Sequence, residues 1–208
     1  MRKTRVQFGL VIVAFALVAG CTSTQPGQPS ATNKTEPGST TSSGSPGSTG
    51  PDAAAPRVPV PLDDAKLVSD PCSALTVIQL QAIGFTAAAK SSVNGSAVGK
   101  VCSWTDDSVG VAGGDIGVAV ETTLTHGISD IYSQKNSMAY FNPMSLDGYP
   151  AVVADHEDGR TTGSCALNLG VSDTSVLALR YQQSDLGPAS CNKVQAVAHA
   201  VIATLRGA

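Results

Sequence analysis

The sequence predicts an α+β domain, in which an antiparallel sheet of about five to six strands is packed by an N-terminal and a C-terminal helix. Three observations predict it. Short segments of alternating apolar residues are separated by turn signals, a capping pattern opens the domain, and the last segment has apolar residues at helical spacing. Strands in hairpin order with helices near both ends are typical of this architecture.

The domain opens with helical signals. Asp70 precedes Pro71, and these residue types are favoured at the N-cap and the first helical position. Thr76 and Gln79 form a capping box, and Gly84 follows as a C-cap. One kinked helix and two short helical pieces fit this pattern equally well.

Residues 86–107 are predicted to form a hairpin. Asn94-Gly95 is a two-residue turn signal. Cys102 and Trp104 then share one face of the second arm, because side chains alternate along a strand. We expect Trp104 to pack in the core beside a disulfide.

A glycine-rich stretch at 108–114 could suggest a phosphate-binding loop, but that interpretation needs a helix directly after it. Residues 115–124 instead alternate as a strand, with Ile116, Val118 and Val120 on one face. We therefore expect only a loop here.

The middle of the domain contains a short predicted helix at 127–135 and an irregular stretch at 136–150. The irregular stretch gathers Tyr140, Phe141 and Tyr149 together with Met144. These side chains could cover an edge of the core or line a ligand groove. Because aromatic residues concentrate where partners bind, we predict a binding surface at Tyr140, Phe141 and Tyr149.

The last third is predicted to contain three strands and a helix. Strands at 151–155 and 162–171 are joined through Asp158-Gly159, and a further strand spans 175–182. Gly187-Pro188 then opens an amphipathic helix. Its apolar stripe consists of Val194, Val197, Ala198, Val201, Ile202 and Leu205.

The first 20 residues are typical of a lipoprotein signal peptide. A basic region with Arg2, Lys3 and Arg5 precedes an apolar run, and small residues lead up to Cys21. The apolar run is short for a membrane-spanning helix, which needs ~20 residues. We expect Cys21 to carry acyl chains such as palmitate, and the protein to be anchored on the extracytoplasmic face of the cell membrane.

Residues 21–61 form a predicted disordered linker rich in Ser, Thr, Gly and Pro, and the folded domain is predicted to span 62–208. The chain has 13 Lys and Arg against 16 Asp and Glu. Loss of the three basic residues with the leader leaves ten against 16, a formal net charge of −6. No basic patch remains, so we expect no nucleic-acid partner.

Besides Cys21, four cysteines remain: Cys72, Cys102, Cys165 and Cys191. An even number in an exported domain indicates two disulfides, and four cysteines allow three pairings. We favour Cys72–Cys102 with Cys165–Cys191, since each closes a loop of moderate length. A zinc site is disfavoured because no CxxC spacing occurs.

A family resemblance rests on these cysteines and their neighbours. Asp70-Pro71-Cys72, Cys102-x-Trp104, Gly148-Tyr149-Pro150-Ala151, Cys165 and Cys191 resemble an actinobacterial cell-envelope lipoprotein family of unknown function, of the mycobacterial and streptomycete type, with a four-cysteine domain. The resemblance implies a lipid-anchored envelope protein with two disulfides, and it implies no activity.

No catalytic motif is present in the sequence. His126, His156 and His199 lack metal-binding spacing, no GxSxG elbow occurs, and no cofactor or metal is expected. We therefore expect a non-enzymatic, monomeric module that binds an envelope protein, glycan or lipid. The alternatives are a carrier that holds an apolar or lipid ligand between sheet and helix, and a hydrolase with an unrecognised site.

Overall fold

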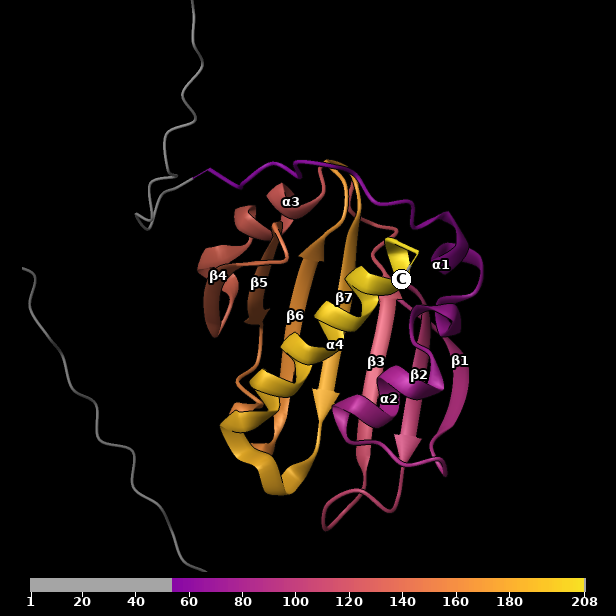
Figure 1. The fold of residues 1–208 in the computed structure, drawn as a ribbon. Helices are drawn as coiled ribbons and strands as arrows, with labels where there is room; N and C mark the ends of the chain where they lie inside the picture. Colours follow the sequence, from indigo (N-terminus) through magenta and orange to yellow (C-terminus); the bar gives the residue numbers. More distant parts are fainter. Residues whose placement is uncertain (1–53, 208) are drawn as a thin grey trace, which may run out of the picture. The chain divides into compact units, whose positions relative to one another are not determined.

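The computed structural model describes residues 54–207, which form an open, seven-stranded antiparallel sheet in the order β1-β2-β3-β7-β6-β5-β4 (Figure 1). The strands are β1 (Lys90–Ser96), β2 (Gly99–Asp106), β3 (Gly114–Val120), β4 (Tyr140–Leu146), β5 (Tyr149–Asp155), β6 (Ser164–Gly170) and β7 (Val176–Gln182). The predicted number of five to six strands is therefore too low, and β4 is the strand that the sequence analysis missed.

Eight helical segments accompany the sheet in the described part of the chain. They are α1 (Ala65–Ser69), η1 (Pro71–Ala74), α2 (Val77–Ile83), α3 (Ile128–Ser133), η2 (Lys135–Ser137), η3 (Arg160–Thr162), η4 (Ser184–Ala189) and α4 (Ser190–Leu205). The C-terminal helix is confirmed, although it begins at Ser190 rather than directly after Gly187-Pro188. The N-terminal helix is instead three short pieces, one of which was not predicted.

The short N-terminal pieces follow the predicted caps only in part. Thr76 and Gln79 form the reciprocal capping box at the start of α2, and Gly84 ends that helix in the left-handed conformation. Pro71 takes the first position of η1, whereas the Asp70 side chain makes no capping hydrogen bond. Because each piece is short, packing on the sheet has to stabilise it.

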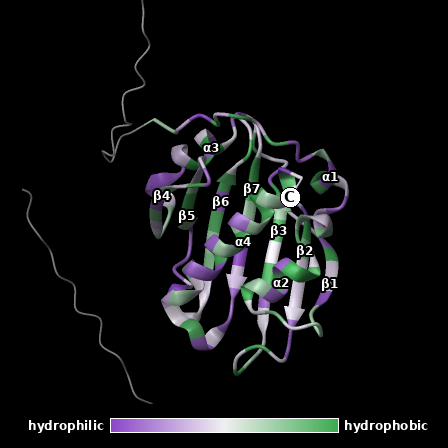
Figure 2. Cartoon of the chain, viewed as in Figure 1, coloured by the Kyte–Doolittle hydropathy of each residue, from purple (hydrophilic) through white to green (hydrophobic). Residues whose placement is uncertain are grey.

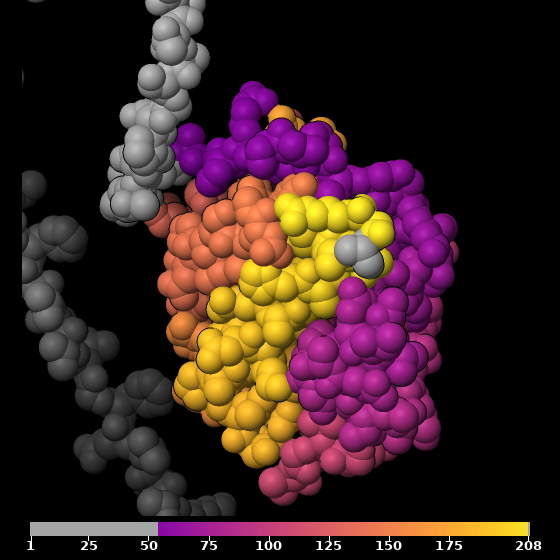
Figure 3. All heavy atoms as spheres, viewed as in Figure 1, coloured from indigo at the N-terminus to yellow at the C-terminus, as the bar shows by residue number. Residues whose placement is uncertain are grey.

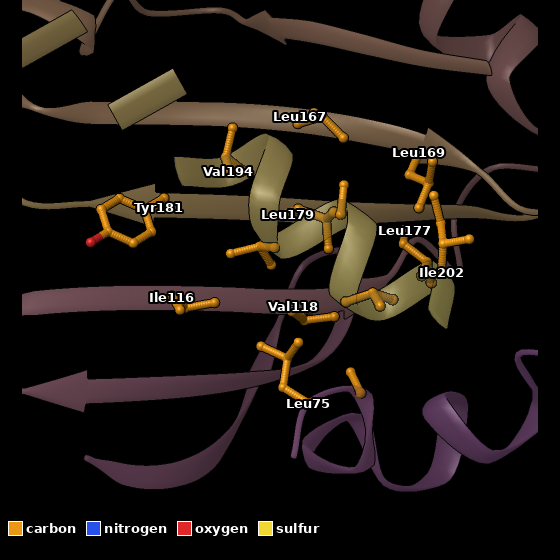
Figure 4. Close-up of a cluster of buried hydrophobic side chains, with 14 of the residues drawn as sticks. Leu75, Ile116, Val118, Leu167, Leu169, Leu177, Leu179, Tyr181, Val194 and Ile202 are labelled. Atoms are coloured by element: carbon orange, nitrogen blue, oxygen red, sulfur yellow. The ribbon is translucent and has the colours of Figure 1, made fainter. Parts of the chain in front are cut away.

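The main core lies between the sheet and α4 (Figure 4). Leu167 of β6 and Leu179 of β7 meet the predicted stripe of α4, of which Val194 and Ile202 are fully buried. Figure 3 shows α4 and α2 side by side over this face of the sheet. The layer between α4 and the sheet is thus filled by protein side chains.

The opposite face of the sheet is covered at one end only. Ile128 and Ile131 of α3 pack on Val152 and Ala154 of β5 and on Val176 of β7. These strand residues alternate with those that face α4, so α3 lies on the other side of the sheet. The central strands carry more hydrophobic residues than β1 (Figure 2).

The first hairpin turns later than predicted. Ser96 pairs with Gly99, so the two-residue turn is Ala97-Val98, and Asn94-Gly95 lies inside β1. Gly99 has φ 139°, and a Cβ there would lie 2.8 Å from the Val120 carbonyl oxygen. The backbone at residue 99 approaches β3 so closely that only glycine fits there. This tertiary contact outweighs the local preference of Asn-Gly for the turn.

Residues 136–150 are not irregular, as the sequence analysis had predicted, but contain β4 and the turn of the β4–β5 hairpin. Asp147 and Gly148 have φ 51° and 88°. Positive φ at both central residues is the geometry of a type I′ turn. Pro143 is accommodated because β4 is an edge strand, where a missing N–H disrupts no ladder on the outer side.

The packed domain begins before residue 62, the predicted boundary. Val58 is buried, its backbone N–H donates to Asp173, and Arg57 forms an ion pair with Asp173 at 2.9 Å. The Leu62 N–H then donates to the Val171 carbonyl oxygen. We call residues 57–62 the N-terminal strap.

Two disulfides join the helical layer to the sheet. Cys72 of η1 is bonded to Cys102 of β2, and Cys165 of β6 to Cys191 of α4. This is the pairing that the sequence analysis favoured. Each bond therefore connects one helical segment to one strand on the α4 side.

The signal peptide, Cys21 and the linker up to residue 53 lie outside the described residues. Within residues 54–207, no helix combines the length and the apolar character that crossing a membrane requires.

Candidate functional site

A shallow hollow of about 520 Å³ occupies the part of the sheet that α3 leaves uncovered. Its floor comes from the face of the central strands that points away from α4. The floor residues are Val101, Ser103, Gly117, Ala119, Ala166, Asn168 and Ala178. Most of them are small, so a partner could approach the backbone of the sheet closely.

The hollow is bounded on two sides. Ile131, Gln134 and Met138 line it from α3 and the segment after it, while Ser96 and Val98 line it from the β1–β2 hairpin. The α3 side is firm, because Ile131 belongs to the cluster that packs on β5 and β7. The lining combines apolar side chains with polar ones, which include Ser103 and Asn168 in the floor.

Two carboxyl groups lie toward the ends of this hollow. Asp115 and Glu121 are half-buried and point to the same face as Gly117 and Ala119, since all four alternate along β3 and its end. Burial raises the pKa of Asp115, an effect that nearby Arg180 opposes. Burial likewise raises the pKa of Glu121.

Arg180 is the cationic side chain of the hollow, and its guanidinium is already engaged. It donates to Asp155 at 2.7 Å and to the Ser164 hydroxyl at 3.1 Å. A second, polar hollow of about 610 Å³ adjoins this cluster and includes His156, Glu157 and Asp158. Its acidic groups are partly neutralised, because Arg160 pairs with Asp158 and lowers the pKa of Asp158 to about 2.

The predicted binding residues do not form a common exposed surface. Tyr140 and Tyr149 are buried, with 8% and 3% of their surfaces exposed, and they belong to the core on the α4 side. Phe141 is half-buried and packs edge-to-face on Tyr132, at 5.1 Å between ring centroids. These rings are structural. Tyr140 and Phe141 are neighbours on β4 and point to opposite faces of the sheet, each into a core, and Tyr149 of β5 enters the same core as Tyr140.

Arg side chains cover the two buried tyrosines from outside. The Arg160 guanidinium lies 4.2 Å from the centroid of the Tyr140 ring, and that of Arg206 lies 5.1 Å from the Tyr149 ring. These cation–π contacts shield the rings further from a partner.

The three histidines lie at separate surface positions. His126 contacts Asp130 at the start of α3, His156 contacts the Ser137 carbonyl oxygen, and His199 contacts Asp147 in the β4–β5 turn. Among residues 54–207, no group of three or more His, Cys, Asp or Glu residues could hold a metal ion.

A buried carboxylate holds the start of the glycine-rich stretch. Asp106 is 1% exposed and accepts hydrogen bonds from the backbone and hydroxyl groups of Thr86 and Ser108. Those bonds lower the pKa of Asp106 well below its usual value. Trp104 is buried on the α4 side next to Cys102, as the alternation predicted.

The large apolar side chains of β3 predict its buried face but not the hollow. In the stretch Asp115-Ile116-Gly117-Val118-Ala119-Val120-Glu121, the branched residues are the ones that face α4. The other face carries only small or acidic residues. A strand with a small, polar second face is the signal that could have identified an uncovered surface.

Comparisons with known proteins place the chain in a family without assigning it an activity. No curated protein and no solved structure matches the chain. A family model described as "protein of unknown function (DUF3558)" matches residues 16–204, which is most of the sequence. The chain therefore belongs to the DUF3558 family.

Proposed function

We propose that the protein is a lipid-anchored cell-envelope protein of the actinobacterial type, held on the extracytoplasmic face of the membrane through Cys21. The support is the basic and apolar leader that ends in small residues before Cys21. Two disulfides fit this location, because such bonds persist in oxidising compartments.

The domain that follows the linker acts as a non-catalytic binding module, and its binding surface is the hollow on the open face of the sheet. The observation that carries this proposal is the floor of small residues around Gly117 and Ala178, both of which are only half-buried. Solvent-facing sheet positions usually carry larger polar side chains. Small residues leave room for a partner to pack on the strands.

A carrier function would have to use the same hollow. The sequence-based alternative placed an apolar ligand between sheet and helix, but Val197, Ala198 and Val201 of α4 are fully buried in that layer. A ligand there would have to displace well-packed core side chains, which is costly. The binding role on the open face needs no such rearrangement.

The anchor is tested by metabolic labelling with an alkyne fatty acid. The wild-type protein is expected to be labelled, and Cys21→Ala is expected to lose both the label and retention in the membrane fraction. Label that persists in Cys21→Ala would refute the anchor without affecting the binding proposal.

The binding surface is tested by photo-crosslinking in cells. A photo-reactive residue in place of Ser103 lies on the floor of the hollow, whereas one in place of Ser91 lies on the opposite side of the neighbouring strand. Adducts are expected at position 103 and not at position 91. Absence of adducts at position 103, with the fold intact by circular dichroism, would refute the hollow as the binding surface.

A further inference from the structure

The charges of the hollow indicate what kind of partner it accepts. Asp115 of β3 and Glu121, which directly follows β3, lie six residues apart on one face, which places them about 20 Å apart along the extended chain. Neither carboxylate has a hydrogen bond or an ion pair with a side chain or backbone group of residues 54–207. The two groups thus mark opposite ends of the same uncovered surface.

Burial of a carboxylate without a partner is unfavourable, because the protein replaces water without supplying donors. Both carboxylates are half-buried, and burial is the largest influence on each of their pKa values. A cationic group bound at each carboxylate would replace the interactions with water that burial has removed. The Asp115 and Glu121 carboxylates therefore each lack a cationic partner in the described part of the chain.

The remaining charges of the hollow do not supply such a cation. Arg180 is close enough to oppose the rise in the pKa of Asp115, but its guanidinium donates to Asp155 and Ser164 and makes no hydrogen bond to Asp115. Leaving His156 aside, the described residues that line the hollow then carry an excess of negative charge. This charge disfavours nucleic acids and anionic lipid headgroups as occupants.

The types of side chain that line the hollow limit the class of binding partner further. The described residues around the hollow include no Phe, Tyr or Trp, so a sugar ring has no aromatic surface on which to stack. Gly117, Ala119 and Ala178 form a low floor on which an extended backbone can lie closely. Ser103 and Asn168 add hydrogen-bonding groups within that floor.

We infer that the hollow binds an extended polypeptide segment that carries two basic side chains about six residues apart, one for Asp115 and one for Glu121. This inference rests on the proposed binding function and specifies its partner. The two basic groups set the position of the segment, and the floor of small residues accommodates its backbone.

The inference is tested by titrating the isotopically labelled chain from residue 21, with Cys21→Ser, and following its amide NMR spectrum. The probe is the capped peptide Lys-Ala-Thr-Ala-Thr-Ala-Lys. We expect saturable shifts in β3 and β7, lost when NaCl rises from about 0.05 M to about 0.5 M. The peptide Glu-Ala-Thr-Ala-Thr-Ala-Glu is expected to give none.

Charge variants identify the two contacts. Asp115→Asn and Glu121→Gln are each expected to weaken binding about fivefold, whereas Asp63→Asn, at an exposed position outside the lining of the hollow, is expected to have no effect. Equal binding of the Glu peptide, or no change in either hollow variant, would overturn the charge assignment. Absence of any shift with the Lys peptide would overturn it as well.

A floor variant separates this inference from the proposed function. A Cβ at Gly117 would meet its nearest neighbours, Arg180 and Val101, at 3.8 Å, so the backbone there accepts a side chain, and Gly117→Val places its methyl groups in the hollow. Gly95→Val, with nothing within 4 Å of its Cβ, is the matched control on the other face. Suppose that both peptides bind the wild-type protein, and that Gly117→Val abolishes their binding while Gly95→Val does not. The hollow is then a binding surface, but the charge inference is wrong.

The protein's own linker is the competing occupant, because Lys34 is its single basic residue between Cys21 and residue 53. Lys34→Gln is expected to leave the affinity for the Lys peptide unchanged. Tighter binding by Lys34→Gln would show that the linker occupies the hollow, and it would overturn the assignment to a separate polypeptide.

Discussion

Removal of the disulfide between Cys165 and Cys191 should destabilise the domain strongly, because it is the covalent connection between β6 and α4. The two Cα atoms are 5.1 Å apart, and the cysteines are separated by 26 positions in the sequence. The double change Cys165→Ala with Cys191→Ala removes this constraint from the unfolded chain.

The expected magnitude follows from loop-closure entropy. For a loop of this length the unfolded chain gains conformational freedom equivalent to about 3.5 kcal/mol. In a domain of about 150 residues, that loss lowers the melting temperature by roughly 10 °C. The Cys72–Cys102 bond, with a separation of 30, should contribute nearly the same amount because the dependence on loop length is logarithmic.

Thermal and urea unfolding, followed by circular dichroism, provide the measurement. The variant Cys72→Ala with Cys102→Ala is the matched comparison, since it removes the other disulfide from the same sheet. A decrease in melting temperature below about 3 °C for the Cys165 and Cys191 variant would refute the estimate. A difference of several kcal/mol between the two variants would show that strain or packing, not chain entropy, determines their effects.

Three further predictions concern single residues. Hydrogen bonding lowers the pKa of Asp106 in the folded state. The stabilisation by Asp106 is therefore complete above the usual carboxyl pKa of about 4 and is lost as the pH falls below that value. Asp106→Asn should unfold more easily at neutral pH and show a weaker pH dependence in acid denaturation. Gly163→Ala should destabilise severely, because φ is 79° and the Cβ would lie 1.9 Å from the Gln183 carbonyl oxygen; urea unfolding should show this loss, while Gly95→Ala stays near wild type. Tyr149→Ala should lower the free energy of unfolding by about 3 kcal/mol or more in the same urea experiment, because the ring is buried. A near-neutral result would show that the ring does not stabilise the core and would again favour a binding role for Tyr149.

The elements with strong periodicity could be predicted from the sequence. The α4 stripe and the strand around Ile116 and Val118 were recognised, because one buried face imposes a regular pattern of large apolar residues. The capping box at Thr76 was also recognised, since its hydrogen bonds involve only neighbouring residues.

The elements that depend on distant contacts could not be predicted. Asn94-Gly95 is a good turn sequence, but the close approach of Gly99 to Val120 shifts the turn by three residues. The strand β4 contains Asn142 and Pro143, which have low strand preference, and it forms because the Asp147-Gly148 turn folds it onto β5. The hollow depends on which strands become neighbours, and a single sequence does not reveal the order of strands in a sheet.

The Cys72–Cys102 bond also determines how the domain carries mechanical load. A pull on the N-terminal side first strains the strap, where the Arg57–Asp173 pair and the hydrogen bond from Leu62 to Val171 can separate one after another. Once tension reaches Cys72, it passes through the sulfur atoms directly into β2. The segment 73–101, which contains α2 and β1, lies within the loop that this disulfide closes, so the covalent path of the force bypasses it, and the contacts of the strap are loaded before the hydrogen bonds of β2.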